Sequence, residues 1–305
     1  MKWRPGTTVE VRSAAEILHT LDDRGMLRGL PFMPEMLAYC GKRFRIFRRI
    51  EKTCAESADS PRRMRAFDGE PVVLLEGVRC DASGHDGCDR ACAIFWHTAW
   101  LAEAGEPTAA PGPPPASATQ FVTRTAAGAY VCQSTELWRA TQPLTRDRRI
   151  RVAWQDIRLR TYPLASMVRS VLVPVWLSLM ARLGFDGQVR GTLTKTPQAD
   201  LGLQPGDLVR VKAKEEIFAT LDRGGANRGL EFGPLMYPFC GRVYKVRQRV
   251  ERIILETTGE MREVRSTVIL ESATCDGRVF FGGCPRDEFH FWREAWLTRV
   301  EPSRP

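Results

Sequence analysis

The chain has 305 residues, enough for two or three domains, and its 43% hydrophobic and 27% charged residues are ordinary for a globular protein. Its net charge of +9 fits an anionic partner, such as nucleic acid, anionic lipid or a phosphorylated small molecule, without choosing among them. The nine cysteines are an odd number, which argues against a complete disulfide framework.

The first residues contain no apolar segment of the kind found in secretory signals, so we expect a cytoplasmic protein. The most apolar stretch, residues 170–181, is shorter than the roughly 20 residues that span a bilayer, and no transmembrane segment is expected. Arg169 and Arg182 bracket it, which fits a buried helix or, less well, an interfacial membrane helix. In a reducing compartment, cysteines favour metal binding or reactive thiols over disulfides.

In chain order, the sequence consists of two copies of one pattern. Residues 11–40 match residues 211–240, and residues 77–101 match residues 272–297. A repeat of this length indicates a duplicated domain. It also allows residues that both copies kept to be compared with residues that only one copy has.

Each copy reads as β-rich. A short alternating strand opens it, a short helix follows, and a basic strand comes after Cys40 or Cys240. Residues 71–77 and 267–272 are apolar strands, and residues 256–260 form a hairpin turn.

The opening of the second copy, LGLQPGDLVRVKA at residues 201–213, resembles that of SH3-like barrels of the KOW type. The resemblance implies a fold that is mainly β, with two duplicated small barrels, and it implies no enzymatic activity. The unduplicated middle reads as helix at residues 134–144 and 154–184, divided by Pro163 and Pro174. We expect this insert to pack across the two barrels.

Four parts are therefore expected. They are copy one at residues 1–104, a Pro/Ala/Gly-rich linker at 105–119, a helical connecting segment at 120–199 and copy two at 200–305.

Three cysteines recur in both copies, and each copy adds a nearby fourth ligand. Four cysteines, or three cysteines and a histidine, make ordinary tetrahedral zinc sites, so two zinc ions are expected. The two expected ligand sets are Cys40, Cys80, Cys88 and Cys92 in copy one and Cys240, Cys275, Cys284 and His290 in copy two.

Other interpretations of these cysteines remain open. An iron–sulfur cluster could use the same residues, and buried structural thiols or a reactive thiol would need no metal. His85 and His97 are alternative fourth ligands, with His97 expected on the exposed side of a helix. Cys132 is a lone thiol or completes a site across domains, and Cys54 is interpreted as incidental.

Other shared residues are candidates for ligand contact. Asp22 and Asp222 are each followed six residues later by an arginine, and the pair could hold a loop or line a groove. An arginine beside the third cysteine could lower its pKa or bind a carboxylate or phosphate. The four candidate arginines are Arg28, Arg90, Arg228 and Arg286.

Two further shared features have simpler interpretations. The tryptophan pairs Trp96/Trp100 and Trp292/Trp296 fit a core seam better than a nucleic-acid stacking surface. The basic strands could follow a phosphate backbone, although their alternation also fits a solvated sheet face.

Two functional hypotheses follow. The first is a zinc-binding tandem-barrel protein that binds a partner. The second is a biosynthetic enzyme that depends on a metal or a thiolate and acts on an anionic small molecule. The catalytic residues of such an enzyme are unknown. No P-loop, G-x-G-x-x-G, H-E-x-x-H or G-x-S-x-G motif is present.

Overall fold

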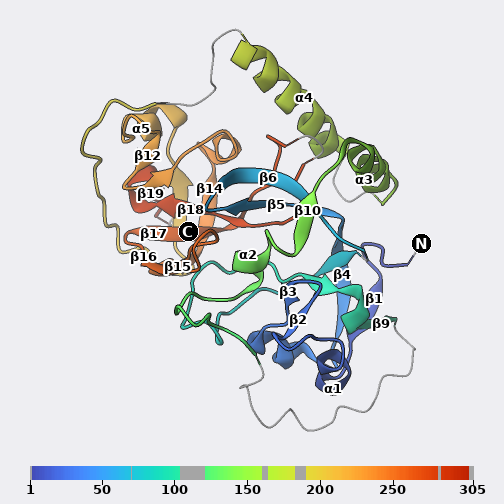
Figure 1. Cartoon of the computed structure of the whole chain (residues 1–305). Helices are drawn as coiled ribbons and strands as arrows, with labels where there is room; N and C mark the ends of the chain where they lie inside the picture. The colour runs from blue at the N-terminus through green and yellow to red at the C-terminus, as the bar shows by residue number, and fades with distance from the viewer. Residues whose placement is uncertain are drawn as a thin grey trace. The chain divides into compact units, whose positions relative to one another are not determined.

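The computed structural model describes residues 2–69, 71–103, 121–159, 164–182, 190–280 and 283–301 (Figure 1). The expected linker at residues 105–119 lies outside these residues. The chain divides into two compact units. Unit 1 comprises Met1–Leu164, Ile254–Arg262 and Cys284–Arg286, and unit 2 comprises Ala165–Ile253, Glu263–Gly283 and Asp287–Pro305. Two segments of copy two therefore belong to unit 1.

A five-stranded antiparallel sheet forms the centre of unit 1, with the strand order β8-β7-β4-β1-β9. Its strands are β1 (Thr8–Val11), β4 (Arg43–Ile50), β7 (Val72–Leu75), β8 (Trp96–His97) and β9 (Leu101–Glu103). The β7 side chains are buried throughout, whereas β4 alternates between buried and exposed positions. The expected apolar strand and the strand with one wet face are therefore confirmed.

The remaining elements of unit 1 are short strands and helices. A second sheet contains β5 (Lys52–Ser57), β6 (Ser60–Phe67) and β10 (Thr141–Pro143), and a small ladder joins β2 (Met26–Leu27) to β3 (Leu30–Pro31). The helices are α1 (Ala14–Leu18), α2 (Gln133–Glu136) and α3 (Arg146–Leu159), with 3-10 turns η1 (Pro34–Tyr39) and η2 (Thr98–Trp100).

Unit 2 contains a sheet with the corresponding order, β18-β17-β14-β11-β19. Its strands are β11 (Leu208–Val211), β14 (Val243–Arg249), β17 (Thr267–Thr274), β18 (Phe289–Arg293) and β19 (Leu297–Arg299). The smaller elements are β12 (Ala226–Asn227), β13 (Leu230–Glu231), α5 (Lys214–Phe218), η4 (Tyr237–Phe239) and η5 (Glu294–Trp296). Strands β15 (Arg252–Ile254) and β16 (Met261–Glu263) form the expected hairpin, of which Ile254–Arg262 belongs to unit 1.

The strand registers of the two sheets repeat with the sequence. Thr8 pairs with Arg45 in unit 1, and Leu208 pairs with Lys245 in unit 2. The duplication therefore preserved both strand order and register. The protein is mainly β with a helical insert.

The tryptophan pairs lie in the core of each copy. Trp96, Trp100, Trp292 and Trp296 all have 0% exposure, which agrees with a core seam and leaves no ring for base stacking. Trp96 and His97 form strand β8, and Trp100 lies in the 3-10 turn η2, so this segment is not a helix. His97 is buried, and the expectation that it lies on the exposed side of a helix is wrong.

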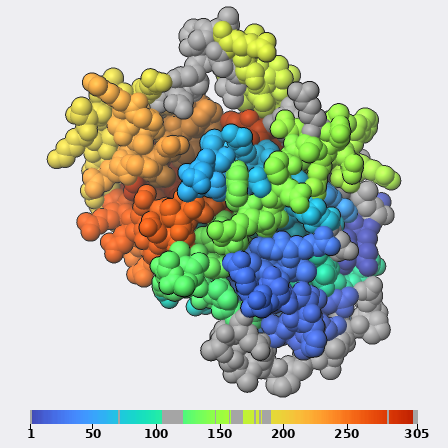
Figure 2. Space-filling model, viewed as in Figure 1, coloured from blue at the N-terminus to red at the C-terminus, as the bar shows by residue number. Residues whose placement is uncertain are grey.

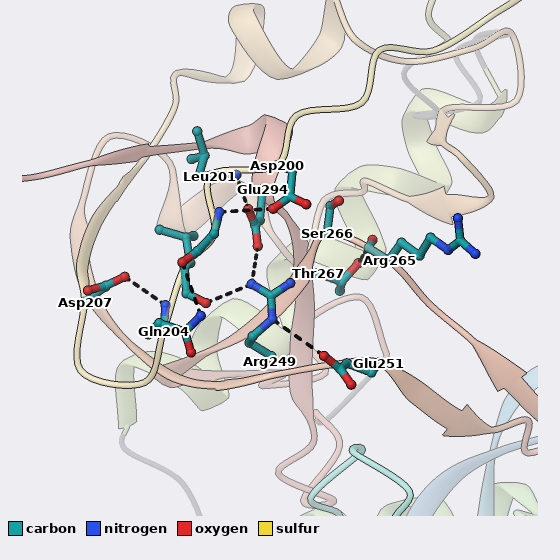
Figure 3. A network of polar contacts seen from close by, with 12 residues as sticks. Asp200, Leu201, Gln204, Asp207, Arg249, Glu251, Arg265, Ser266, Thr267 and Glu294 are labelled. Carbon is teal, nitrogen blue, oxygen red and sulfur yellow. Dashed lines mark hydrogen bonds and ion pairs between the residues drawn. The ribbon is translucent and has the colours of Figure 1, made fainter.

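Unit 2 also holds a buried acidic group at the start of η5. Glu294 has no exposed surface, and its carboxylate accepts a hydrogen bond from Arg249 Nη1 at 3.0 Å and another from the backbone N–H of Leu201 (Figure 3). Arg249 Nη1 also donates to the carbonyl of Leu203 at 2.9 Å. The buried charge is thus paired and hydrogen-bonded, as burial requires.

The helical insert differs from expectation. Only α2 and a short strand, β10, form within residues 134–144, and Pro174 lies inside helix α4 (Leu164–Arg182) instead of dividing it. One side of α4 is exposed at the surface (Figure 2, yellow-green), so the prediction of a buried helix at this position is wrong. In the described part of the chain, no helix has the length and hydropathy needed to cross a membrane.

Candidate functional site

A small cavity in unit 1 is lined by seven of the residues that the sequence singled out, including Arg90 and Arg286. It has a volume of about 30 Å³, and its lining includes four cysteines and one histidine. They are Cys80, Cys88, Cys92, Cys132 and His85. The rest of the lining is mostly apolar, with Met33, Ile94 and Phe95 among its residues.

The loop from Cys80 to Cys92 bends sharply around this cavity. Ala82, Asp86, Gly87 and Ala91 have positive φ angles of 54°, 49°, 71° and 48°. Three of these are not glycine, and left-handed backbone is uncommon for such residues. The backbone N–H of Cys80 donates to the carbonyl of Cys92 at 2.9 Å, which ties the two ends of the loop together.

Backbone N–H groups point at three of the four sulfur atoms. Cys88 Sγ accepts from the N–H of Ile254 at 3.3 Å, and Cys80 Sγ accepts from the N–H of Ala82. Cys132 is the N-cap residue of α2. Burial raises the pKa of its thiol, and the N–H groups of Thr135 and Ser134 offset part of that rise. Donors aimed at sulfur favour the thiolate over the thiol.

Burial has the opposite effect on the same sulfur atoms. It raises the pKa of Cys132 and, with the neighbouring charges of Glu35 and Cys92, raises the pKa of Cys80 far above the usual range. Without a cation in the cavity, these two thiols are therefore neutral at pH 7. A bound cation would supply the charge that burial denies them.

Glu35 connects this loop to η1. Its Oε1 lies 3.0 Å from Cys80 Sγ, which donates to it, and 2.9 Å from His85 Nδ1. His85 Nε2 lies 2.9 Å from the carbonyl of Val131. Both ring nitrogens face acceptors, so the arrangement suits an imidazolium that donates twice.

The pKa shifts of this pair agree with that assignment. Burial disfavours the charged imidazolium, but the hydrogen bond and charge of Glu35 outweigh it and raise the pKa of His85. Burial likewise disfavours the carboxylate, but His85 outweighs it and lowers the pKa of Glu35. A Cβ atom on Gly84 would lie 2.8 Å from Glu35 Oε2, so the loop needs glycine at this position. His85, an alternative fourth ligand in the sequence, is thus a buried and fixed residue.

The two Cys-x-Arg segments each clamp one residue of a hairpin from the other copy. Cys88 Sγ accepts the N–H of Ile254 at 3.3 Å, and Arg90 Nη1 donates to its carbonyl at 3.1 Å. In the same way, Cys284 Sγ accepts the N–H of Cys54 at 3.3 Å, and Arg286 Nη1 donates to its carbonyl at 3.1 Å. All of these segments belong to unit 1. Cys54, which we interpreted as incidental, is therefore a clamped residue.

Glu256 neutralises the two clamp arginines. Arg286 makes two hydrogen bonds of 2.9 Å to its carboxylate, and both side chains are almost fully buried. Arg90 lies 3.7 Å from the same carboxylate. Both arginines were candidates for ligand contact. They line the cavity and also hold main chain and a buried glutamate.

Arg28 and Arg228 occupy turns rather than a ligand groove. Both have positive φ angles, 53° and 48°. The Arg28 guanidinium lies over Gly69, and the Arg228 carbonyl accepts a 2.7 Å hydrogen bond from Arg293. The shared aspartates cap the same turns: Asp22 accepts the N–H groups of Arg24 and Met26.

The other expected metal ligands lie outside the cavity lining. Cys40 packs against the core of unit 1, where burial raises its pKa to about 11. In unit 2, Cys240 packs against the core, the N–H of Cys275 donates to the carbonyl of Glu288 at 2.7 Å, and the His290 ring stands edge-on to Phe239. Within the described residues, no three His, Cys, Asp or Glu side chains are grouped to hold a metal ion. The two tetrahedral zinc sites therefore stay predictions.

Much of the basic strand charge is paired along the sheets. In unit 1, Arg43 lies 2.9 Å from Glu10 and Arg49 lies 2.6 Å from Glu51. In unit 2, Lys245 lies 4.0 Å from Glu271. This pairing fits a solvated sheet face, and binding of a polyanion by these strands stays a prediction.

Comparison of the chain with models of protein families, with curated proteins and with solved structures found no match. The resemblance to SH3-like barrels therefore rests on the sequence pattern alone.

Proposed function

We propose that the thiol-lined cavity of unit 1 is a metal–thiolate centre, with zinc as the most probable ion by ligand chemistry, in a non-catalytic tandem SH3-like protein that binds a partner. The ligands would be Cys80, Cys88, Cys92 and Cys132, which line one cavity but are not grouped as a metal site in this structure, so the Cys80–Cys92 loop would have to draw them together on binding. Four thiolates are an ordinary zinc ligand set. When bound, zinc would supply the positive charge that stabilises buried thiolates.

The observation that carries the proposal is the set of N–H donors aimed at sulfur inside an apolar cavity. Backbone groups of Ala82, Ile254 and Ser134 each donate to a different cysteine. Hydrogen bonds to ligand sulfur are a recurrent feature of metal–thiolate sites. The size of the cavity also supports a small occupant. A volume of 30 Å³ is room for about two or three water molecules, which suits a single ion better than an organic molecule.

The residues around the sulfur atoms would hold the centre in place. Glu35 and His85 fix the loop through their mutual 2.9 Å contact and through the contact of His85 with the carbonyl of Val131, and the Arg90 clamp fixes Cys88 against Ile254. The enzyme hypothesis has less support. His85 uses both ring nitrogens for contacts within the protein, and the thiol of Cys80 is held neutral. A nucleophilic thiolate needs a lowered pKa instead.

Metal analysis of protein purified without oxygen tests the proposal. We expect a colourless protein with about one zinc per chain. Cys132→Ser should lose the zinc, whereas Cys40→Ser should keep it, because Cys40 is half-buried but outside the cavity.

Other results would overturn the assignment. A metal-free wild-type protein, or equal metal content in both variants, would leave structural thiols as the explanation. Iron with visible thiolate-to-iron absorption would replace zinc with a cluster. About two zinc per chain would revive the copy-two set of Cys240, Cys275, Cys284 and His290.

A further inference from the structure

Helix α4 carries a continuous apolar stripe on its exposed side. The stripe residues recur at the spacing i, i+3, i+4, i+7, i+8 and i+11, which places them on one face of a helix. They are Val168, Val171, Leu172, Val175, Trp176 and Leu179, each between 41% and 61% exposed. Single exposed apolar residues need no explanation, but a row of six along one helix marks an interaction site.

The opposite side of the helix is already covered. Ser170 is buried, and Val173, Pro174 and Met180 are half-buried. A surface helix of a globular protein usually has an apolar side facing the core and a polar side facing water. In α4 the side facing water is apolar as well. The helix has 19 residues, so the stripe extends over most of a length of about 28 Å.

The charges on this helix are all positive. Residues 164–182 contain Arg169 and Arg182 and no acidic residue. Exposed Arg169 and Arg182 stand three residues from Leu172 and Leu179, on the same helix face as the stripe.

This charge distribution selects among the partners that could cover an apolar stripe. A second copy of the chain would bring another net charge of +9 against the first, which opposes association. An anionic bilayer attracts clustered arginines and accepts apolar side chains at the boundary between headgroups and acyl chains. Tryptophan, present in the stripe as Trp176, is enriched at that boundary.

We propose that the α4 stripe docks the protein onto the surface of an anionic lipid membrane. The helix would lie in the plane of the membrane, with the stripe inserted among the headgroups. Arg169 and Arg182 would extend along the surface to lipid phosphates, as long basic side chains do at interfaces. This inference does not depend on the metal centre, which is formed by residues of unit 1.

Co-sedimentation of the full chain with lipid vesicles tests this proposal. We expect binding to vesicles of phosphatidylcholine mixed with phosphatidylserine, weaker binding to phosphatidylcholine alone, and a decrease with added salt. The triple variant Leu172→Ser/Trp176→Ser/Leu179→Ser should reduce partitioning by about tenfold for each side chain removed. The double variant Leu208→Ser/Val243→Ser is the matched control. Its residues are 39% and 42% exposed but lie on sheet strands, so its partitioning should not change.

Circular dichroism and urea denaturation would confirm that each variant is folded. Equal partitioning of the triple variant and the wild type, or no binding to anionic vesicles by the wild type, would overturn the proposal. Light scattering that shows a wild-type dimer dissociated by the triple variant would assign the stripe to a second copy and would also overturn it.

Discussion

The cysteine loops of the two copies share one set of features and differ in another. Both keep a Cys-x-Arg segment that clamps a hairpin residue, at Cys88–Arg90 and Cys284–Arg286. Both have left-handed residues before and after this segment, Gly87 and Ala91 in copy one and Gly283 and Asp287 in copy two. The clamp therefore belongs to the fold that was duplicated.

The differences collect around the cavity of unit 1. Glu35 and Cys92 correspond to Leu235 and Glu288 in copy two, and Cys132 has no counterpart. These unshared residues surround the cavity or hold its loop. The residues that both copies share therefore act mainly in folding. The residues that only copy one has form the candidate site.

The largest expected effect separates the two clamps. Arg286→Met would leave Glu256 buried without its paired hydrogen bonds, and we expect a loss of about 3–5 kcal/mol in the free energy of unfolding. Arg90→Met removes a carbonyl hydrogen bond and a 3.7 Å contact, so we expect a loss of only about 1–2 kcal/mol. Urea denaturation of both variants measures the difference. Equal losses would mean that the two clamps are energetically equivalent, contrary to this account.

The next effect tests how tightly the copy-one loop is fixed. Gly84→Ala places a Cβ atom 2.8 Å from Glu35 Oε2 and 2.9 Å from Pro34 Cγ, and we expect a loss of about 1–3 kcal/mol. Gly77→Ala is the control, because its Cβ meets nothing within 4 Å and only the positive φ of 73° opposes it. For Gly77→Ala we expect a loss of about 1–2 kcal/mol in the free energy of unfolding, with unchanged metal content. Thermal unfolding with metal analysis checks both. A Gly84→Ala protein with wild-type stability and metal content would argue against a fixed Glu35–His85 contact.

The smallest change in the free energy of unfolding is expected for replacing the cysteines of the two clamps. The two substitutions distinguish a cysteine that only clamps a hairpin from one that also lines the cavity. Cys284→Ser should lower the free energy of unfolding by about 1 kcal/mol, because the hydrogen bond from the N–H of Cys54 is weakened, and it should leave metal content unchanged. Cys88→Ser should cost a similar amount in metal-free protein but should also abolish metal binding, because Cys88 lines the cavity. Denaturation with and without a chelator would show this. If Cys284→Ser also loses the metal, the division between shared clamp and unshared site is wrong.

The sequence predicted the sheets because their information is local. Alternating and apolar runs formed β4, β7 and β17, and the structure adds that Thr8 and Leu208 hold equivalent registers in the two copies. The hairpin of β5 and β6 was missed, since its polar residues do not alternate. The clamps were missed because Cys54 meets Cys284 across 230 positions of sequence, which no local pattern encodes.

The candidate site was predicted only in part, because local sequence patterns do not show which distant residues meet. Cys80, Cys88 and Cys92 line the cavity, but the fourth cysteine there is Cys132 rather than Cys40. Glu35 was not considered. Its replacement by Leu235 is one of many differences between residues 11–40 and 211–240, so the sequence comparison does not single it out.

Zinc-edge X-ray absorption of the wild-type chain tests the central claim most directly. The account predicts bound zinc with a first shell of about four sulfur atoms, supplied by the cavity cysteines of unit 1. A shell that contains imidazole nitrogen, or protein that holds no zinc after careful preparation, would contradict it.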